Sequence, residues 1–156
     1  MRHIIKYLIK KNMKAIAVFH GGSVVKFVQS NPNGFVSVKG KITGLPRGKH
    51  GFHIHEYGDL SGKGCMTAGS HFNPKGHPHG GLRDEKSHAG DLGNVENGPV
   101  NFRTKKFSLY GKNSVIGRSL IIHEDADDLG RGGHSDSTTT GHAGKRIDCA
   151  VIGITN

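Results

Sequence analysis

GFHIHEYGD, at residues 51–59, places two histidines at alternate positions of an apolar, strand-like run. In an extended strand, residues i and i+2 lie on the same face, so His53 and His55 can both face one metal ion while Ile54 packs on the other side. This stretch therefore predicts a β-strand and, on one face of it, half of a metal site.

Further potential metal ligands follow along the chain. With His53 and His55 they make six imidazoles and one carboxylate, more than one ion usually needs, so the set indicates two adjacent ions. One of the two would be held almost wholly by nitrogen, which favours copper beside zinc. The further ligands are His71 in HFNP, His79 in PHGG, His88 and Asp91 in HAGDLGN, and His123 in LIIHEDADDLG.

The rest of the chain is typical of an all-β protein. Gly (25 residues) and Pro (5 residues) separate short runs rich in Val, Ile and Phe, and no long stretch has helical periodicity. The pattern predicts one antiparallel sandwich or barrel, with a hairpin turn at NPNG (31–34) because Asn and Gly tolerate positive φ. Two polar, Gly-rich segments, about 56–92 and 124–146, are expected to be functional loops. The predicted strands lie in KAIAVF (14–19), VVKFVQ (24–29), FVSVKGKIT (35–43), KKFSLY (105–110), RSLIIH (118–123) and CAVIGI (149–154).

The formal net charge of +10 is partly concentrated in residues 1–12, which contain no acid. That segment lacks the continuous apolar stretch of a secretory signal and is too short to span a bilayer. We expect a disordered basic extension at 1–12, a single domain at 13–156 and a cytoplasmic location. The alternatives are translation from Met13 and a short mitochondrial or membrane-surface address. The cations of the extension are Arg2, Lys6, Lys10 and Lys11.

The order of GFHIHE, HFNP, GDLGN, HEDADDLG and GHAGKRIDCAVIGI resembles the copper/zinc superoxide dismutase family, from about Lys14 to the C-terminus. The resemblance implies an eight-stranded Greek-key barrel, immunoglobulin-like in architecture, with two long functional loops. It also implies an antioxidant oxidoreductase. Such an enzyme converts superoxide to dioxygen and hydrogen peroxide by alternate reduction and oxidation of a histidine-bound copper.

The same resemblance assigns the ligands to two metals. His71 would bridge the ions through its two ring nitrogens and take part in proton transfer, and the zinc would be structural because its four protein ligands leave no position for water. The copper ligands are His53, His55, His71 and His123, and the zinc ligands are His71, His79, His88 and Asp91. The other histidines are not assigned to metal, although His77 is a rival for the place of His79.

Further residues receive roles from the family pattern. Arg146 matches an anion-anchoring arginine beside copper, and Thr140 matches a residue that narrows the opposite wall of the channel. Asp127 matches a carboxylate that connects His53 with His79. The resemblance also pairs Cys65 with Cys149 in a disulfide, where two free thiols are the usual arrangement in a cytosolic protein.

The resemblance further implies a homodimer, built on the loop near Gly58 and Asp59, on Ile116 and Gly117, and on Gly153 and Ile154. Strict dependence on a dedicated copper chaperone is the weaker expectation, because Lys145 and Ile147 flank Arg146 where strictly dependent members carry prolines. Two other function classes stay open. A copper carrier or storage protein would bind metal without turnover. A basic nucleic-acid or surface-binding module would need a binding motif, and the chain has no such motif and no Trp.

Overall fold

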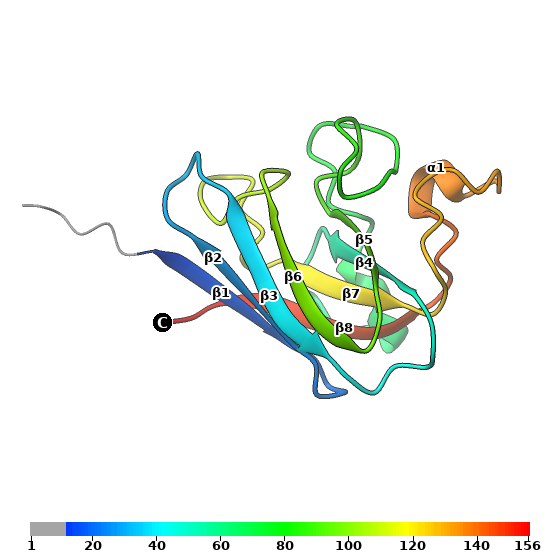
Figure 1. Cartoon of the computed structure of the whole chain (residues 1–156), viewed down its shortest axis with the longest axis horizontal. Helices are drawn as coiled ribbons and strands as arrows, with labels where there is room; N and C mark the ends of the chain where they lie inside the picture. Colours follow the sequence, from blue (N-terminus) through cyan, green and yellow to red (C-terminus); the bar gives the residue numbers. More distant parts are fainter. Residues whose placement is uncertain (1–11) are drawn as a thin grey trace, which may run out of the picture.

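The structure, a computed structural model, describes residues 12–156 (Figure 1). Over this range eight antiparallel strands form one sheet that curls into a nearly closed barrel, which confirms the all-β prediction. The strands are β1 (Met13–Val18), β2 (Val24–Gln29), β3 (Val36–Ile42), β4 (His50–His55), β5 (Asp91–Val95), β6 (Gly98–Thr104), β7 (Ser119–His123) and β8 (Arg146–Ile154). Two short helices, the 3-10 helix η1 (Lys63–Ala68) and α1 (Ser137–Thr140), lie in the long loops.

The strand order is β5-β4-β7-β8-β1-β2-β3-β6, and the neighbours pair antiparallel. β3 pairs with β6 and β4 pairs with β7, although neither pair is consecutive in the chain. These crossing connections are those of a Greek key, as predicted. β8 pairs with both β7 and β1 and so joins the two halves of the sheet.

Alternation of apolar and polar residues sends one face of most strands into the barrel. In β2, Val25 and Phe27 are fully buried while Lys26 between them is exposed. β4 differs because all six of its residues are buried. Phe52 and Ile54 belong to the apolar core, whereas the histidines between and beside them are covered by the long loops. The largest fully buried apolar side chains are Phe27, Phe52, Ile42, Ile54, Leu109, Leu120, Ile121, Ile122 and Ile152.

One predicted strand is wrong. KKFSLY (105–110) follows β6 as an irregular segment, although Phe107 and Leu109 are buried in the core. Side chains satisfy part of its backbone: Thr104 Oγ1 accepts the N–H of Lys106, and Gln29 Oε1 accepts the N–H of Leu109. The strand in this region lies earlier, at β6.

The turn at NPNG forms between β2 and β3, but not by the predicted conformation. The Gly34 N–H donates to the Asn31 carbonyl at 3.0 Å, and none of residues 31–34 is among those with positive φ. The side chain of Asn31 instead accepts the N–H of Asn33 at 3.1 Å, which stabilises the turn as an Asx-type hydrogen bond.

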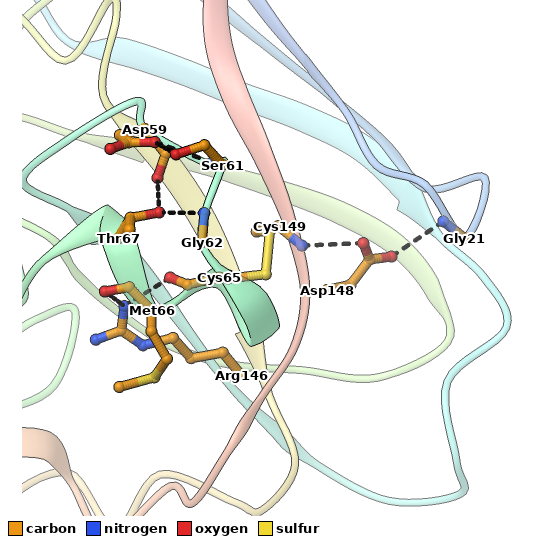
Figure 2. The surroundings of a disulfide bond; sticks show 10 residues. All are labelled: Gly21, Asp59, Ser61, Gly62, Cys65, Met66, Thr67, Arg146, Asp148 and Cys149. Atoms are coloured by element: carbon orange, nitrogen blue, oxygen red, sulfur yellow. Dashed lines mark hydrogen bonds between the residues drawn. A yellow bond between two sulfur atoms is a disulfide. The ribbon is translucent and has the colours of Figure 1, made fainter.

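The two long loops connect β4 to β5 and β7 to β8. A disulfide between Cys65 in η1 and Cys149 in β8, with Cα atoms 6.3 Å apart, ties the first loop to the barrel across 84 positions of sequence (Figure 2). The predicted disulfide is therefore present, and it lies beside Arg146, which donates to the Cys65 carbonyl at 2.9 Å (Figure 2).

The N-terminal extension predicted at 1–12 lies, apart from Asn12, outside the described residues. β1 begins at Met13, so the proposed boundary coincides with the start of the barrel, and the division into extension and domain stays a prediction. In the described part of the chain, no helix has the length and apolar character needed to cross a membrane.

Candidate metal centre

The strands bring the predicted ligands together by register. His53 of β4 lies opposite Asp91 of β5, and His123 lies at the end of β7 opposite Arg146. An isolated bridge places His71 beside His55. Two strand ends and the first long loop therefore meet at one side of the barrel.

Four imidazoles form the first cluster, with one donor atom from each within 4.8 Å of the others. His55 Nε2 and His123 Nε2 face one another at 3.4 Å, because the Nδ1 atoms of these rings face the carbonyls of Gly69 and Gly144 at 2.9 and 3.1 Å. The members of this cluster are His53, His55, His71 and His123, the predicted copper set.

Two nitrogens of this cluster have no polar partner. Over residues 12–156, the buried atoms His53 Nδ1 and His71 Nε2 make no hydrogen bond. A buried polar atom left without a partner costs about 1–3 kcal/mol, so such atoms call for an explanation. A metal ion bound by both nitrogens, together with His55 and His123, would satisfy them. An all-nitrogen set of this kind suits copper.

Asp91 is the centre of the second cluster. Its Oδ1 lies 2.9 Å from His79 Nδ1, 3.1 Å from His71 Nδ1 and 3.2 Å from His88 Nδ1. His71 Nδ1 and His88 Nδ1 are themselves 3.2 Å apart. Ligands on a tetrahedral zinc at about 2.0–2.1 Å would be about 3.3 Å from one another, so the four atoms are close to the spacing that zinc requires.

The compact second group of potential ligands within residues 12–156 contains His53, His71, His79 and Asp91. It has His53 where the sequence places His88. Two contacts distinguish these rings. His53 Nε2 is 2.6 Å from Asp127 Oδ2 and its Nδ1 is the unpartnered atom of the first cluster, whereas His88 Nδ1 points at Asp91. These contacts favour His88 as the fourth ligand of the second cluster.

His71 belongs to both clusters. Its Nδ1 faces Asp91 and His88, and its Nε2 is the unpartnered atom facing the other side. The rings of His53 and His71 have centroids only 4.1 Å apart. One imidazole can therefore contact two ions through its two nitrogens.

Asp127 links the clusters from behind. Its two carboxylate oxygens face His53 Nε2 at 2.6 Å and His79 Nε2 at 2.8 Å, and the carboxylate is fully buried. Each ring would thereby hold a proton on Nε2 and leave Nδ1 for a metal. The predicted connection between these two histidines is thus present in the geometry.

Burial sets the protonation of the first cluster. Burial and the neighbouring His71 hold the pKa values of His53 and His55 well below the usual range for histidine. Burial also lowers the pKa of His123 to about 4. These rings are neutral at physiological pH, and the neutral ring is the form that binds a metal.

Charge is arranged differently in the second cluster. Burial opposes ionisation of Asp91, but hydrogen bonds from His71, His79 and His88 outweigh it and hold the pKa of Asp91 far below its ordinary value. Burial likewise opposes a charge on His79, yet hydrogen bonds to Asp127 and Asp91 raise its pKa to about 9. The site therefore stabilises positive charge beside Asp91, as a zinc ion would supply.

A cavity opens onto the first cluster. Arg146 is held in its wall by hydrogen bonds from Nη1 to the Cys65 carbonyl at 2.9 Å and from Nη2 to the Gly69 carbonyl at 2.6 Å. The cavity is lined by His55, His71, His123, Thr140, Lys145 and Arg146, among other residues. The guanidinium is fixed by the same loop that the disulfide holds.

The other histidines of residues 12–156 stay outside the clusters. His77 lies on the cavity wall, but its Nδ1 faces the Ser87 carbonyl at 3.3 Å, and it belongs to neither group of potential ligands in the described residues. Both ring nitrogens of His50 face backbone carbonyls, of His123 and Pro46, at 2.9 Å.

The structure adds three supporting residues that the sequence did not single out, and two of them hold Asp127 in place. Asn94 of the GDLGN motif donates from its side chain to the Asp127 carbonyl at 2.9 Å and accepts the Asp127 N–H at 2.7 Å. Gly141, at φ 72°, leaves room for this link: a Cβ there would lie 2.1 Å from Asp127 Oδ1 and 2.5 Å from His79 Nε2. The GDLGN and TGHAGK segments carried the signal, but neither residue could be singled out.

The third addition is Lys106, whose ammonium lies partly buried against the first long loop. It donates to the carbonyls of Gly81 and Asp91, each at 3.1 Å, and to the hydroxyl of Ser87. Burial lowers the pKa of Lys106. The lysine fastens the loop of the second cluster to the end of β6.

Comparison with known protein families supports the geometry. Residues 22–152 match the family model described as copper/zinc superoxide dismutase (SODC). The match covers most of the chain and contains the seven potential ligands, Arg146 and both cysteines. This family comprises oxidoreductases that act on superoxide with copper and zinc. The chain therefore belongs to the copper/zinc superoxide dismutase family.

Proposed function

We propose that this chain catalyses superoxide dismutation at a copper held by the first cluster, beside a zinc held by His71, His79, His88 and Asp91. The observation that carries the proposal is the position of His71, whose ring presents Nδ1 to one donor set and an unpartnered Nε2 to the other. Copper, when bound, supplies the one-electron chemistry that the reaction needs.

The chain's own groups would then bind and protonate the substrate. His71 Nε2 is the atom at which the shared ring can hold a proton whenever it is not bound to a metal, and release it toward an anion in the cavity, since this nitrogen has no hydrogen-bond partner among the described residues. The position of His71 in the cavity wall gives that proton a direct route to substrate.

Arg146 would anchor the superoxide anion. Its charge is close enough to the first cluster to lower the pKa values of His55 and His123. Two loop carbonyls fix the guanidinium, so it is already oriented when an anion arrives. Lys145 and Thr140 also line this cavity, where Lys145 would add positive charge and Thr140 would restrict the width.

The second cluster would be structural. Its four donors complete a tetrahedron and leave no protein position for water, and its ligands belong to the first long loop and the start of β5. Zinc would therefore order the loop and fix the ring of His71. Asp127 would keep the rings of His53 and His79 in the binding orientation.

We also propose a homodimer built on the loop near Gly58, on Gly117 and on the end of β8, with exposed apolar residues of β1 and β8 beside them. Val18 and Val151 are exposed to 61% and 41%, and Ile154 at the chain end to 70%. Gly58 supports this face, since a Cβ there would lie 2.2 Å from the Gly117 carbonyl. Light scattering after size exclusion tests the dimer. Cytoplasmic location and partial independence of a copper chaperone stay predictions from the resemblance.

Stopped-flow measurement of superoxide decay tests the proposed activity. Protein loaded with copper and zinc, with bound metal quantified, is expected to accelerate the decay far beyond the metal-free control, and the rate should fall as ionic strength rises. Full copper occupancy without a rate above the control would reject the enzyme and favour copper carriage or storage.

A further inference from the structure

The outer face of β2, β3 and β6 carries positive charge without any acid. No Asp or Glu occurs in residues 13–55 or 97–123, so β1, β2, β3 and β6 are free of carboxylates. Among Lys and Arg side chains of residues 12–156, only Arg131 forms an ion pair, with Asp84. The exposed cations of the face, called here the basic face, are Lys26, Lys39, Lys41 and Arg103, with Lys105 directly after β6.

The register places these charges against one another. Lys26 lies directly opposite Lys39 on the neighbouring strand, and Lys41 is one step further along the same face. Neighbouring strands are about 4.8 Å apart and residues on one face repeat about every 7 Å. Like charges directly opposite one another destabilise a sheet, so this face gains stability when an anionic partner covers it.

The composition of the basic face favours a lipid surface over a nucleic acid. The charges spread over three strands in two dimensions, and most are lysines, whose compact charge needs no oriented, bidentate partner. The exposed aromatic residue at this end of the sheet is Phe35, and the cations of Arg103 and Lys105 already lie 4.6 and 4.8 Å from its ring centroid. A series of open rings for base stacking is therefore missing from this face.

The N-terminal sequence points to the same partner. Met13, the first residue of β1, lies in the same cross-strand row as Val36 and Thr104, which are next to Phe35 and Lys105 in the chain. The chain therefore enters the barrel at the end of the strands where Phe35 and Lys105 lie (Figure 1). Besides four cations, that segment contains Ile4, Ile5, Tyr7, Leu8 and Ile9. Apolar residues interspersed with cations suit the boundary between headgroups and acyl chains, and do not suit a nucleic acid or a polysaccharide. The row is defined by the pairings of Met13 with Gln29, Gln29 with Val36 and Val36 with Thr104.

We propose that the basic face docks on an anionic lipid bilayer. The cavity beside the first cluster is lined by residues of β4, β7, β8 and the long loops, and by none of the cations of the basic face. Docking by the basic face is thus compatible with an open cavity. It would concentrate the protein near a membrane without a spanning segment.

Sedimentation of the metal-loaded full chain with vesicles tests this proposal. Binding is expected to vesicles of phosphatidylcholine with one quarter phosphatidylserine, to be absent with pure phosphatidylcholine, and to weaken with salt. Each cation removed should reduce the partition coefficient about fivefold, so the variant Lys26→Gln/Lys39→Gln/Lys41→Gln should lose roughly 100-fold. Truncation before Met13 should also weaken binding.

A matched variant separates the face from total charge. Lys63→Gln/Arg83→Gln/Lys86→Gln removes the same charge from exposed positions of the first long loop and should bind much better than the face variant. Equal losses in both variants would overturn the assignment to the basic face. The lipid partner would be overturned by equal binding to vesicles with and without phosphatidylserine, or by undiminished binding after truncation. It would also be overturned if the protein preferred a single-stranded oligonucleotide or a sulfated polysaccharide to the vesicles. Thermal unfolding checks that each variant is folded.

Discussion

Replacing Asp127 by Asn should weaken zinc binding while keeping the size of the side chain. The carboxylate accepts one hydrogen bond from His53 at 2.6 Å and one from His79 at 2.8 Å, through different oxygens. It also accepts the N–H of Leu129 at 2.7 Å. An amide keeps one acceptor and turns a donor toward the second ring, so one of the two rings loses its orienting bond.

The expected loss follows from that single bond. Removal of a partner behind a metal-bound histidine commonly lowers metal affinity by about 10- to 100-fold, which corresponds to about 1.4–2.7 kcal/mol. A charge-assisted hydrogen bond contributes a similar amount. Zinc should be lost before copper, because a given set of nitrogen and oxygen ligands generally binds Cu(II) more tightly than zinc.

Competition with a chromophoric chelator measures this change directly. The Asp125→Asn variant is the control, since it makes the same charge change at an exposed position of the same loop and should stay within about twofold of the parent. Unchanged zinc affinity in Asp127→Asn would refute the orienting role of the carboxylate.

Three further predictions concern other parts of the site. Lys106→Met should leave carbonyls of the first long loop without their hydrogen-bond donor and so lower the free energy of unfolding by about 2 kcal/mol, measured by urea denaturation. An unchanged free energy of unfolding would mean that the ammonium does not hold the loop. In stopped flow, Arg146→Gln should lower kcat/KM about tenfold or more with copper occupancy unchanged, and Arg146→Lys should recover part of that loss. An unaltered rate in the Gln variant would contradict the role of Arg146 as the anchor of the superoxide anion. The pKa of His79 is raised to about 9 and only the neutral ring binds metal, so the zinc affinity of the metal-free protein should rise with pH up to about pH 9 and then level off. Titration calorimetry in buffers of different pH measures this dependence. A zinc affinity that does not change between pH 7 and pH 9 would contradict the prediction.

The fold was largely predictable where burial follows a local pattern. Alternation marks VVKFVQ as a strand with one buried face, and the continuous apolar run of SLIIH marks a strand buried on both faces. KKFSLY shows the limit: its apolar residues do enter the core, but the backbone bonds to Gln29 and Thr104 side chains in place of a neighbouring strand. β5 and β6 were missed because Gly, Pro and Asn interrupt their apolar pattern. Pairing between strands far apart in the chain supplies what local propensity lacks.

The candidate site was predictable as a set of residues but not as a set of atoms. The order of the histidine motifs indicated which side chains belong together, and the clusters contain them. Which nitrogen each ring offers depends on distant partners, such as Asp127 behind His53 and the Gly69 carbonyl behind His55. Lys106 gave no signal at all, since a lysine after a strand is ordinarily a solvent-exposed residue.

Anomalous scattering from crystals of the copper- and zinc-loaded protein, recorded at the absorption edges of both metals, tests the shared-ligand account most directly. Two peaks are expected on opposite sides of the His71 ring, with copper at Nε2 beside His53, His55 and His123, and zinc at Nδ1 beside His79, His88 and Asp91. A single peak, or a zinc peak that contacts neither His71 nor His88, would contradict it.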